Sequence, residues 1–383
     1  MDLTAGPVVV ASVGLAVVAV VAVPWTWQRW RHPQAVRSAL VLLATAAVLL
    51  AGAAAVNRQA GFFPTAHSLV SGQGAGIRVG RDGVLAALPP NVVPVDLSAV
   101  GAERRADHGA VVEVQLSGSI SGLRRSGAVY LPAAYFDPAQ AQVRFPVLEV
   151  LSGSPGSPAQ TLHLLRLAEV LDAGVAAFQV APTVVVVPDT NGSAVHDREC
   201  VDAAGSTQDD TYLTSDVQSF LGQRFRVLPP GRGWGLMGTS TGGYCAVNLA
   251  LRHPDRYAAA ASLSGYFHAL TDVTTGDLFH GRALRQANDP TWRVQNLPLP
   301  AVALWLSAGT GEVRELDDLR DFAAVLPASA DVTTVVVPGA GHAFPAWAAL
   351  LPQALSWVSS RLPPATAPPS LLPGQGVVSG RAG

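Results

Sequence analysis

Two long uncharged stretches dominate the hydrophobic pattern at the start of the chain. One runs from Leu3 to Trp27 and the other from Ser38 to Val56, and both are rich in Ala, Val and Leu. Because about 20 apolar residues are enough for a helix to cross a bilayer, the pattern predicts a two-helix membrane anchor over residues 1–60. The alternative is that one stretch is a signal peptide, since the small residues at 51–55 resemble a cleavage site.

The connection between the two stretches predicts their orientation. Arg29, Arg31 and Arg37 lie in it, close to tryptophans that suit the membrane interface. Short loops rich in basic residues stay on the cytoplasmic side. We therefore expect a protein of the cell membrane in which everything after Val56 is extracytoplasmic. The signal-peptide alternative leads to the same location.

Beyond residue 109, short aliphatic runs alternate with amphipathic segments. This pattern is typical of an α/β domain in which helices cover both faces of a mostly parallel sheet, here of about eight strands. The expected strands span residues 111–116, 128–131, 146–151, 183–187, 233–237, 258–262, 301–307 and 332–337. The expected helices span residues 161–171, 215–225, 242–252, 317–326 and 345–362.

The segments on either side of this domain, which we place at residues 110–362, have a different composition. Residues 61–109 contain many Gly and Pro and little periodicity, so we expect an extracytoplasmic linker there. Residues 363–383 are rich in Pro, Ala and Gly and are expected to be a disordered tail.

The composition argues against two kinds of site. The formal net charge is only −2, so no basic face for nucleic acid stands out. The two cysteines, Cys200 and Cys245, are too few and too isolated for a zinc site of the usual spacing, and we expect no metal. An extracytoplasmic location favours a disulfide between them.

One motif suggests nucleophilic chemistry. Residues 235–243 place a Gly-x-Ser-x-Gly sequence directly after an aliphatic strand and directly before a helical segment. A nucleophile elbow has this context, because its tight turn requires small residues around the serine. Ser240 is therefore the candidate nucleophile. The alternative is a purely structural turn in a glycine-rich protein.

A base and an acid follow in the order that this motif requires. His342 ends a glycine-rich loop after the last expected strand and is the candidate general base. The acid is expected after the preceding strand. Glu312 lies closest to the end of that strand and is favoured. Glu315 lies near a helix start, where it would offset the helix dipole, and stays an alternative.

Two backbone N–H groups are expected to form an oxyanion hole. One belongs to Thr241, which follows the nucleophile at the start of a helix. The other belongs to Ser154, in the loop after the third expected strand. Pro155 in that loop has no N–H to donate.

Several segments together resemble the esterase D and feruloyl esterase superfamily, and most of all the secreted mycolyltransferases of actinobacterial cell walls. These segments are Thr211–Asp216, the serine motif, Leu249–Asp255 and Ala259–Gly265. The resemblance implies an α/β-hydrolase fold and ester hydrolysis or acyl transfer, without a metal or organic cofactor. It also implies an ester or acyl-lipid substrate, with a sugar or alcohol as the acceptor in a transfer.

The resemblance leaves the acid open. Gly309–Glu312 is similar to the acid loop of feruloyl esterases, whereas Glu315 before Leu316 is similar to the acid position of mycolyltransferases. The loop at 152–157 lacks the charged residues with which mycolyltransferases bind their sugar acceptor, and Ala343-Phe344 replaces the Ser-Trp pair after their histidine. These differences argue against trehalose as the acceptor.

These patterns predict a serine carboxylic-ester hydrolase or acyltransferase that forms an acyl-enzyme at the outer face of the membrane. A non-catalytic cell-envelope binding or assembly protein on the same fold is the alternative from a different class. A peptidase on the same scaffold is a third possibility.

Overall fold

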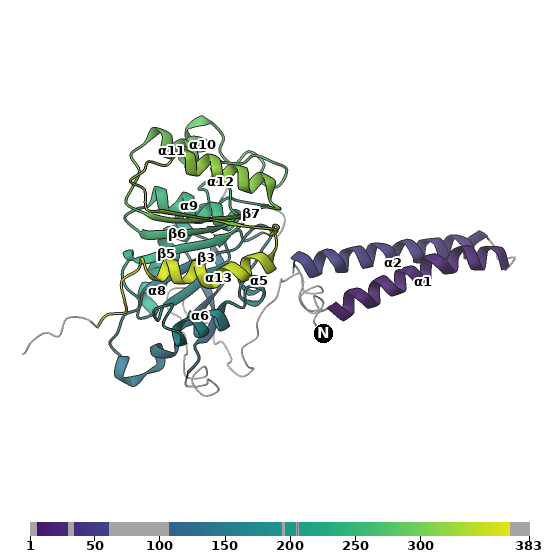
Figure 1. Ribbon diagram of the computed structural model, residues 1–383, viewed down its shortest axis with the longest axis horizontal. Helices are drawn as coiled ribbons and strands as arrows, with labels where there is room; N and C mark the ends of the chain where they lie inside the picture. Colours follow the sequence, from purple (N-terminus) through teal and green to yellow (C-terminus); the bar gives the residue numbers. More distant parts are fainter. Residues whose placement is uncertain are drawn as a thin grey trace, which may run out of the picture.

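The computed structural model describes residues 6–29, 34–60, 107–193, 196–203, 205 and 207–367. The first two ranges form the helices α1 (Gly6–Arg29) and α2 (Gln34–Ala60), and the other ranges form an α/β domain (Figure 1). Most of the predicted linker and most of the predicted tail, residues 61–106 and 368–383, lie outside the described residues.

Helices α1 and α2 are each long and apolar enough to cross a membrane. Their spans Pro7–Pro24 and Val36–Ala55 have mean hydropathies of 2.5 and 2.2. Only 6% and 11% of these spans are buried, whereas an equally apolar helix in the core of a soluble protein would be mostly buried. The two helices are therefore candidate membrane spans, as the sequence predicts.

Small side chains bring the two helices together. Ala16 of α1 and Ala44 and Ala51 of α2 are each 7% exposed, while the larger Leu15 and Leu50 point outward. Small residues let helix backbones approach closely, which is a common way for membrane helices to pack.

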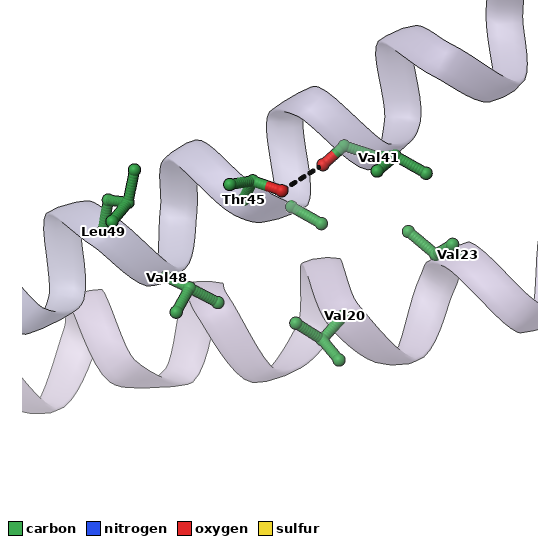
Figure 2. Close-up of a pocket in the computed structure, with 7 residues that line it drawn as sticks. Val20, Val23, Val41, Thr45, Val48 and Leu49 are labelled. Atoms are coloured by element: carbon green, nitrogen blue, oxygen red, sulfur yellow. Dashed lines mark hydrogen bonds between the residues drawn. The ribbon is translucent and has the colours of Figure 1, made fainter.

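A groove between the two helices is lined mainly by valines (Figure 2). Val20 and Val23 of α1 and Val41 and Val48 of α2 contribute to it, together with Thr45. The Thr45 hydroxyl donates to the carbonyl oxygen of Val41 at 2.9 Å. Since the core of a bilayer offers no water, this internal bond makes the hydroxyl compatible with a membrane.

Within the described residues, eight strands form one sheet in the order β1-β2-β4-β3-β5-β6-β7-β8. The first two pairs, β1–β2 and β2–β4, are antiparallel, and all other neighbours are parallel. The strands are β1 (Ala110–Ser117), β2 (Arg124–Leu131), β3 (Val147–Leu151), β4 (Val184–Pro188), β5 (Gly231–Thr239), β6 (Tyr257–Leu263), β7 (Ala303–Gly309) and β8 (Val332–Val337). This is the mostly parallel α/β-hydrolase sheet that the sequence predicts.

Burial on both faces explains the aliphatic runs. Every residue of β3 and β4 is buried, and β4 reads Val-Val-Val-Val-Pro. A strand covered on both faces needs apolar side chains on both. Each of the eight predicted strands accordingly overlaps an observed one.

Two sets of helices cover the two faces of the sheet (Figure 1). On one face lie α5 (Pro158–Leu164), α6 (Leu167–Ala176) and α13 (Phe344–Ser359). On the other lie α8 (Gln218–Arg224), α9 (Thr241–Arg252) and α12 (Val313–Val325). Shorter elements are η1 (Ala133–Phe136), η2 (Pro138–Gln140), α7 (Asp209–Thr211), η3 (Tyr212–Val217, a π-helix), α10 (Arg282–Ala287) and α11 (Pro290–Asn296).

Four segments differ from the predicted helices. The helix expected at 215–225 begins as the π-helix η3 and continues as α8. The helix expected at 161–171 is two helices, because Arg166 between them takes a left-handed backbone conformation with φ 50°. The helix expected at 317–326 begins earlier, at Val313, so that Glu312 is its N-cap residue and Glu315 lies in its first turn. Helices α10 and α11 form where the periodicity predicts none.

Candidate active site

Ser240 stands at the sharp turn between β5 and α9. Its backbone angles are φ 54° and ψ −125°, a region that residues with side chains rarely adopt. The Ser240 N–H donates to the carbonyl oxygen of Leu263 at 2.9 Å, and the Ser240 carbonyl oxygen accepts from the N–H of Gly243 at 2.8 Å. These bonds hold the strained turn at the carboxyl ends of the parallel strands.

The glycines of the motif are required by backbone contacts. A Cβ atom on Gly238 would lie 2.1 Å from the carbonyl oxygen of Gly242. A Cβ atom on Gly242 would lie 2.1 Å from the carbonyl oxygen of Leu151. Both distances are far below contact distance, so the turn leaves no room for a side chain at either position.

The side chains of Ser240, His342 and Glu312 form a continuous hydrogen-bonded chain. Oγ of Ser240 lies 2.9 Å from Nε2 of His342. Nδ1 of His342 lies 2.7 Å from Oε1 of Glu312. The structure thus brings together three residues that the sequence separates by up to 102 positions.

Glu312 is buried and anchored through both carboxylate oxygens. Oε2 accepts from the N–H of Gly309 at 2.5 Å and from the hydroxyl of Ser264 at 2.9 Å. Burial by itself raises the pKa of Glu312, but the hydrogen bonds from His342, Gly309 and Ser264 outweigh it and hold the pKa below its ordinary value. The group is therefore a carboxylate at neutral pH, as an acid that orients an imidazolium must be.

Ser264 contacts Glu312 and Trp347 contacts His342, and the sequence predicts a role for neither. Ser264 accepts a hydrogen bond from Nε1 of Trp347 at 2.9 Å while its own hydroxyl donates to Glu312. The Trp347 ring also packs edge-on against His342, with ring centroids 5.1 Å apart. Ser264 lies in a segment that carries the family resemblance, and that was the only available signal for it.

Glu315 lies near this chain without joining it. It sits in the first turn of α12 and is partly exposed. A carboxylate oxygen of Glu315 lies within 4.8 Å of a carboxylate oxygen of Glu312 and of a ring nitrogen of His342, a spacing that would suit a metal ion. The Glu312 carboxylate and the His342 imidazole are already bonded to each other, however. The geometry therefore favours Glu312 as the partner of His342.

The two residues expected to supply oxyanion donors flank the nucleophile. Thr241 is the first residue of α9, and N–H groups in the first turn of a helix have no partner within it. Ser154 belongs to the loop between β3 and α5 and precedes Pro155 through a cis peptide bond. In this loop, a Cβ atom on Gly153 would lie 3.1 Å from Cβ of Ser240. The loop thus passes directly against the nucleophile.

The predicted disulfide is present. Cys200, in the loop after β4, is bonded to Cys245 of α9, with Cα atoms 5.9 Å apart. Both cysteines are fully buried. The bond therefore ties that loop to the helix that begins directly after the nucleophile.

Replacing both cysteines with alanine should destabilise the domain. The bridge restricts the unfolded chain across a sequence separation of 45 residues, so we expect the free energy of unfolding to fall by about 2 to 4 kcal/mol. Denaturant unfolding of the full chain in detergent, followed by tryptophan fluorescence, measures the change. A loss well under about 1 kcal/mol would contradict a stabilising role for the bridge.

Two curated relatives show what the chain is similar to. An uncharacterized protein of Corynebacterium glutamicum is 28% identical over 268 residues, which cover 66% of this chain and 62% of that protein. The diacylglycerol acyltransferase/mycolyltransferase Ag85A of Mycobacterium leprae is 27% identical over 124 residues, or 28% of this chain and 37% of that protein. The chain therefore spans less than two thirds of the length of either relative.

A solved structure agrees with the fold. A ferulic acid esterase superposes with a TM-score of 0.58 at 20% identity, covering 67% of this chain and 98% of the other. At this identity the similarity shows the α/β-hydrolase fold.

A family match covers most of the described α/β domain. Residues 117–358 match the family described as "Putative esterase". The match is longer than half of the chain and includes Ser240, Glu312 and His342. The resemblance predicted from the sequence is confirmed, and the chain belongs to this esterase family.

Proposed function

We propose that this protein is a serine carboxylic-ester hydrolase or acyltransferase that acts at the outer face of the membrane. The observation that carries the proposal is the unbroken chain of hydrogen bonds from Ser240 through His342 to Glu312. The buried disulfide supports an oxidising, extracytoplasmic location for the domain. Helices α1 and α2 would hold it at the membrane surface.

The first half of the proposed reaction forms an acyl-enzyme. Nε2 of His342 accepts the proton of the Ser240 hydroxyl as Oγ attacks the ester carbonyl carbon. Glu312 orients the imidazole and stabilises its charged form. The N–H groups of Thr241 and Ser154 bind the oxygen that becomes negative, and one such donor is worth about 3 to 4 kcal/mol. The departing alcohol then takes the proton from His342.

The second half releases the acyl group. His342 removes a proton from water or from an acceptor alcohol, whose oxygen attacks the acyl carbon. The bond from that carbon to Ser240 breaks, and His342 returns the proton to the Ser240 oxygen. Water yields a carboxylic acid, and an alcohol yields a new ester. A ferulic acid esterase and a diacylglycerol acyltransferase/mycolyltransferase are both similar to this chain, which supports both outcomes.

An ester panel tests the proposal. The full chain in detergent is assayed on p-nitrophenyl esters and acylglycerols of increasing acyl length, with and without sugar and alcohol acceptors. Turnover that depends on acyl length supports the proposal, and new ester formed from an added acceptor identifies a transferase. If no ester is turned over and no fluorophosphonate reacts with the protein, a non-catalytic cell-envelope binding or assembly protein becomes the better account.

A further inference from the structure

Asp197 is a buried carboxylate next to the nucleophile that the proposed reaction does not use. It lies in the loop after β4 and is 6% exposed. Oδ2 accepts from the Thr241 hydroxyl at 2.7 Å, and Oδ1 accepts from the N–H of Glu199 at 3.1 Å. The Ser154 side chain also interacts with this carboxylate and lowers its pKa.

Thr241 and Ser154, the two side chains that face Asp197, belong to different segments of the chain. Thr241 begins α9, whereas Ser154 belongs to the separate loop between β3 and α5. They are the two residues whose N–H groups are proposed to bind the oxyanion. Asp197 comes from a third segment, accepts a hydrogen bond from the Thr241 hydroxyl and interacts with the Ser154 side chain. One carboxylate therefore contacts both of the segments that must converge on a single substrate oxygen.

Burying the Asp197 carboxylate costs free energy of folding. Desolvation raises the pKa of Asp197, and the hydrogen bonds from Thr241 and Glu199, together with the interaction with Ser154, only partly offset it. A buried carboxylate that is hydrogen-bonded in this way holds neighbouring groups in one geometry.

The loop that carries Asp197 is itself held on two sides. The Asp197 N–H donates to the carbonyl oxygen of Thr274 at 3.1 Å. A few residues further along, Cys200 is bonded to Cys245 in α9. The hydroxyl of Tyr266 donates to Oε1 of Glu199 at 2.7 Å. These contacts limit the movement of the carboxylate relative to Thr241.

We propose that Asp197 is a positioning residue that keeps the backbone donors of Thr241 and Ser154 aligned on the oxyanion. The proposal rests on the proposed function, because it presupposes acyl transfer through Ser240. Asp197 does not touch the substrate. Its effect passes through Thr241 and Ser154, so removing it should weaken binding of the transition state more than binding of the ester.

Kinetics of the full-length Asp197→Asn and Asp197→Ala variants test this. Asparagine preserves the shape of the side chain but replaces one acceptor oxygen with an NH₂ group, so it cannot accept from both the Thr241 hydroxyl and the Glu199 N–H in the same geometry. We expect kcat per fluorophosphonate-titrated site to fall roughly 10- to 100-fold, with KM changed less than about threefold. Affinity for a trifluoromethyl ketone, which loads the oxyanion hole, should fall by a similar factor.

A matched control lies on the same loop. Asp202 accepts from the N–H and the hydroxyl of Thr211, at 3.0 and 2.6 Å, and within the described part of the chain it makes no hydrogen bond to Thr241 or Ser154. Asp202→Asn perturbs the anchoring of the loop and should leave kcat per site near the wild-type value. A double-mutant cycle of Asp197→Asn with Thr241→Val should show that the two losses are not additive.

The outcomes separate the inference from the proposed function. Wild-type kcat and inhibitor affinity in both Asp197 variants, in an enzyme that is otherwise active, would overturn the inference alone. So would equal losses in Asp202→Asn, because they would mark a purely structural effect. A wild-type protein that neither hydrolyses esters nor reacts with fluorophosphonate would overturn the proposed function and this inference together.

Discussion

Ester turnover by Ser240→Ala should be roughly four to six orders of magnitude below that of the wild type, because the variant lacks the attacking oxygen. The substituted methyl group fits the same turn, so the fold should be preserved. Steady-state cleavage of a p-nitrophenyl ester measures the loss, and the unfolding midpoint serves as the control for folding.

The Ser240 variant also separates catalysis from binding. It should still bind the ester while failing to release p-nitrophenol. Near wild-type turnover by a variant that is folded and free of contaminating esterase would refute Ser240 as the nucleophile.

Glu312→Gln is expected to lower kcat roughly 10³- to 10⁴-fold, the scale seen when a triad acid becomes an amide. The amide presents an N–H to Nδ1 of His342, which favours the wrong tautomer and removes the charge that stabilises the imidazolium. The same steady-state ester assay measures the effect.

Glu315→Gln is the matched comparison, because it makes the same chemical change a few positions away in the first turn of α12. We expect kcat to change less than about threefold, since Glu315 has no hydrogen bond to His342 among the bonds of the described residues. A larger loss in Glu315→Gln than in Glu312→Gln would reverse the assignment of the acid.

Much of the fold was predictable because buried strands and helices show recognisable patterns of apolar residues in the sequence. Strands such as β4 are covered on both faces and read as continuous aliphatic runs. The motif around Ser240 could also be recognised from the sequence. Close backbone contacts at Gly238 and Gly242 leave no room for a side chain, so both positions must be glycine. The pairing of Cys200 with Cys245 followed from their number and the expected location.

The choice between Glu312 and Glu315 was harder to predict, because both lie close to the start of helix α12. The periodicity placed the start of α12 at residue 317, and the helix begins at Val313. With a start at residue 317 both glutamates would precede the helix. In the structure Glu312 is its N-cap residue and bonds to His342, whereas Glu315 lies in its first turn. Local patterns locate helix ends only to within a few residues.

The supporting residues could not be predicted because their partners are distant in sequence. Ser264 reaches Glu312, and Trp347 reaches Ser264, only after β6, α12 and α13 have packed together. Asp197 likewise reaches Thr241 across 44 positions. No periodicity or local motif marks such contacts, so they become visible only in the folded structure.

The central claim is that the Ser240 hydroxyl is activated by His342, and site-resolved labelling tests it most directly. The full chain is treated with a fluorophosphonate, digested and analysed by mass spectrometry, alongside a His342→Ala variant. We predict a single adduct on Ser240 in the wild type and labelling slowed by several orders of magnitude in the variant. An unlabelled Ser240, or equally fast labelling without the imidazole, would contradict the account.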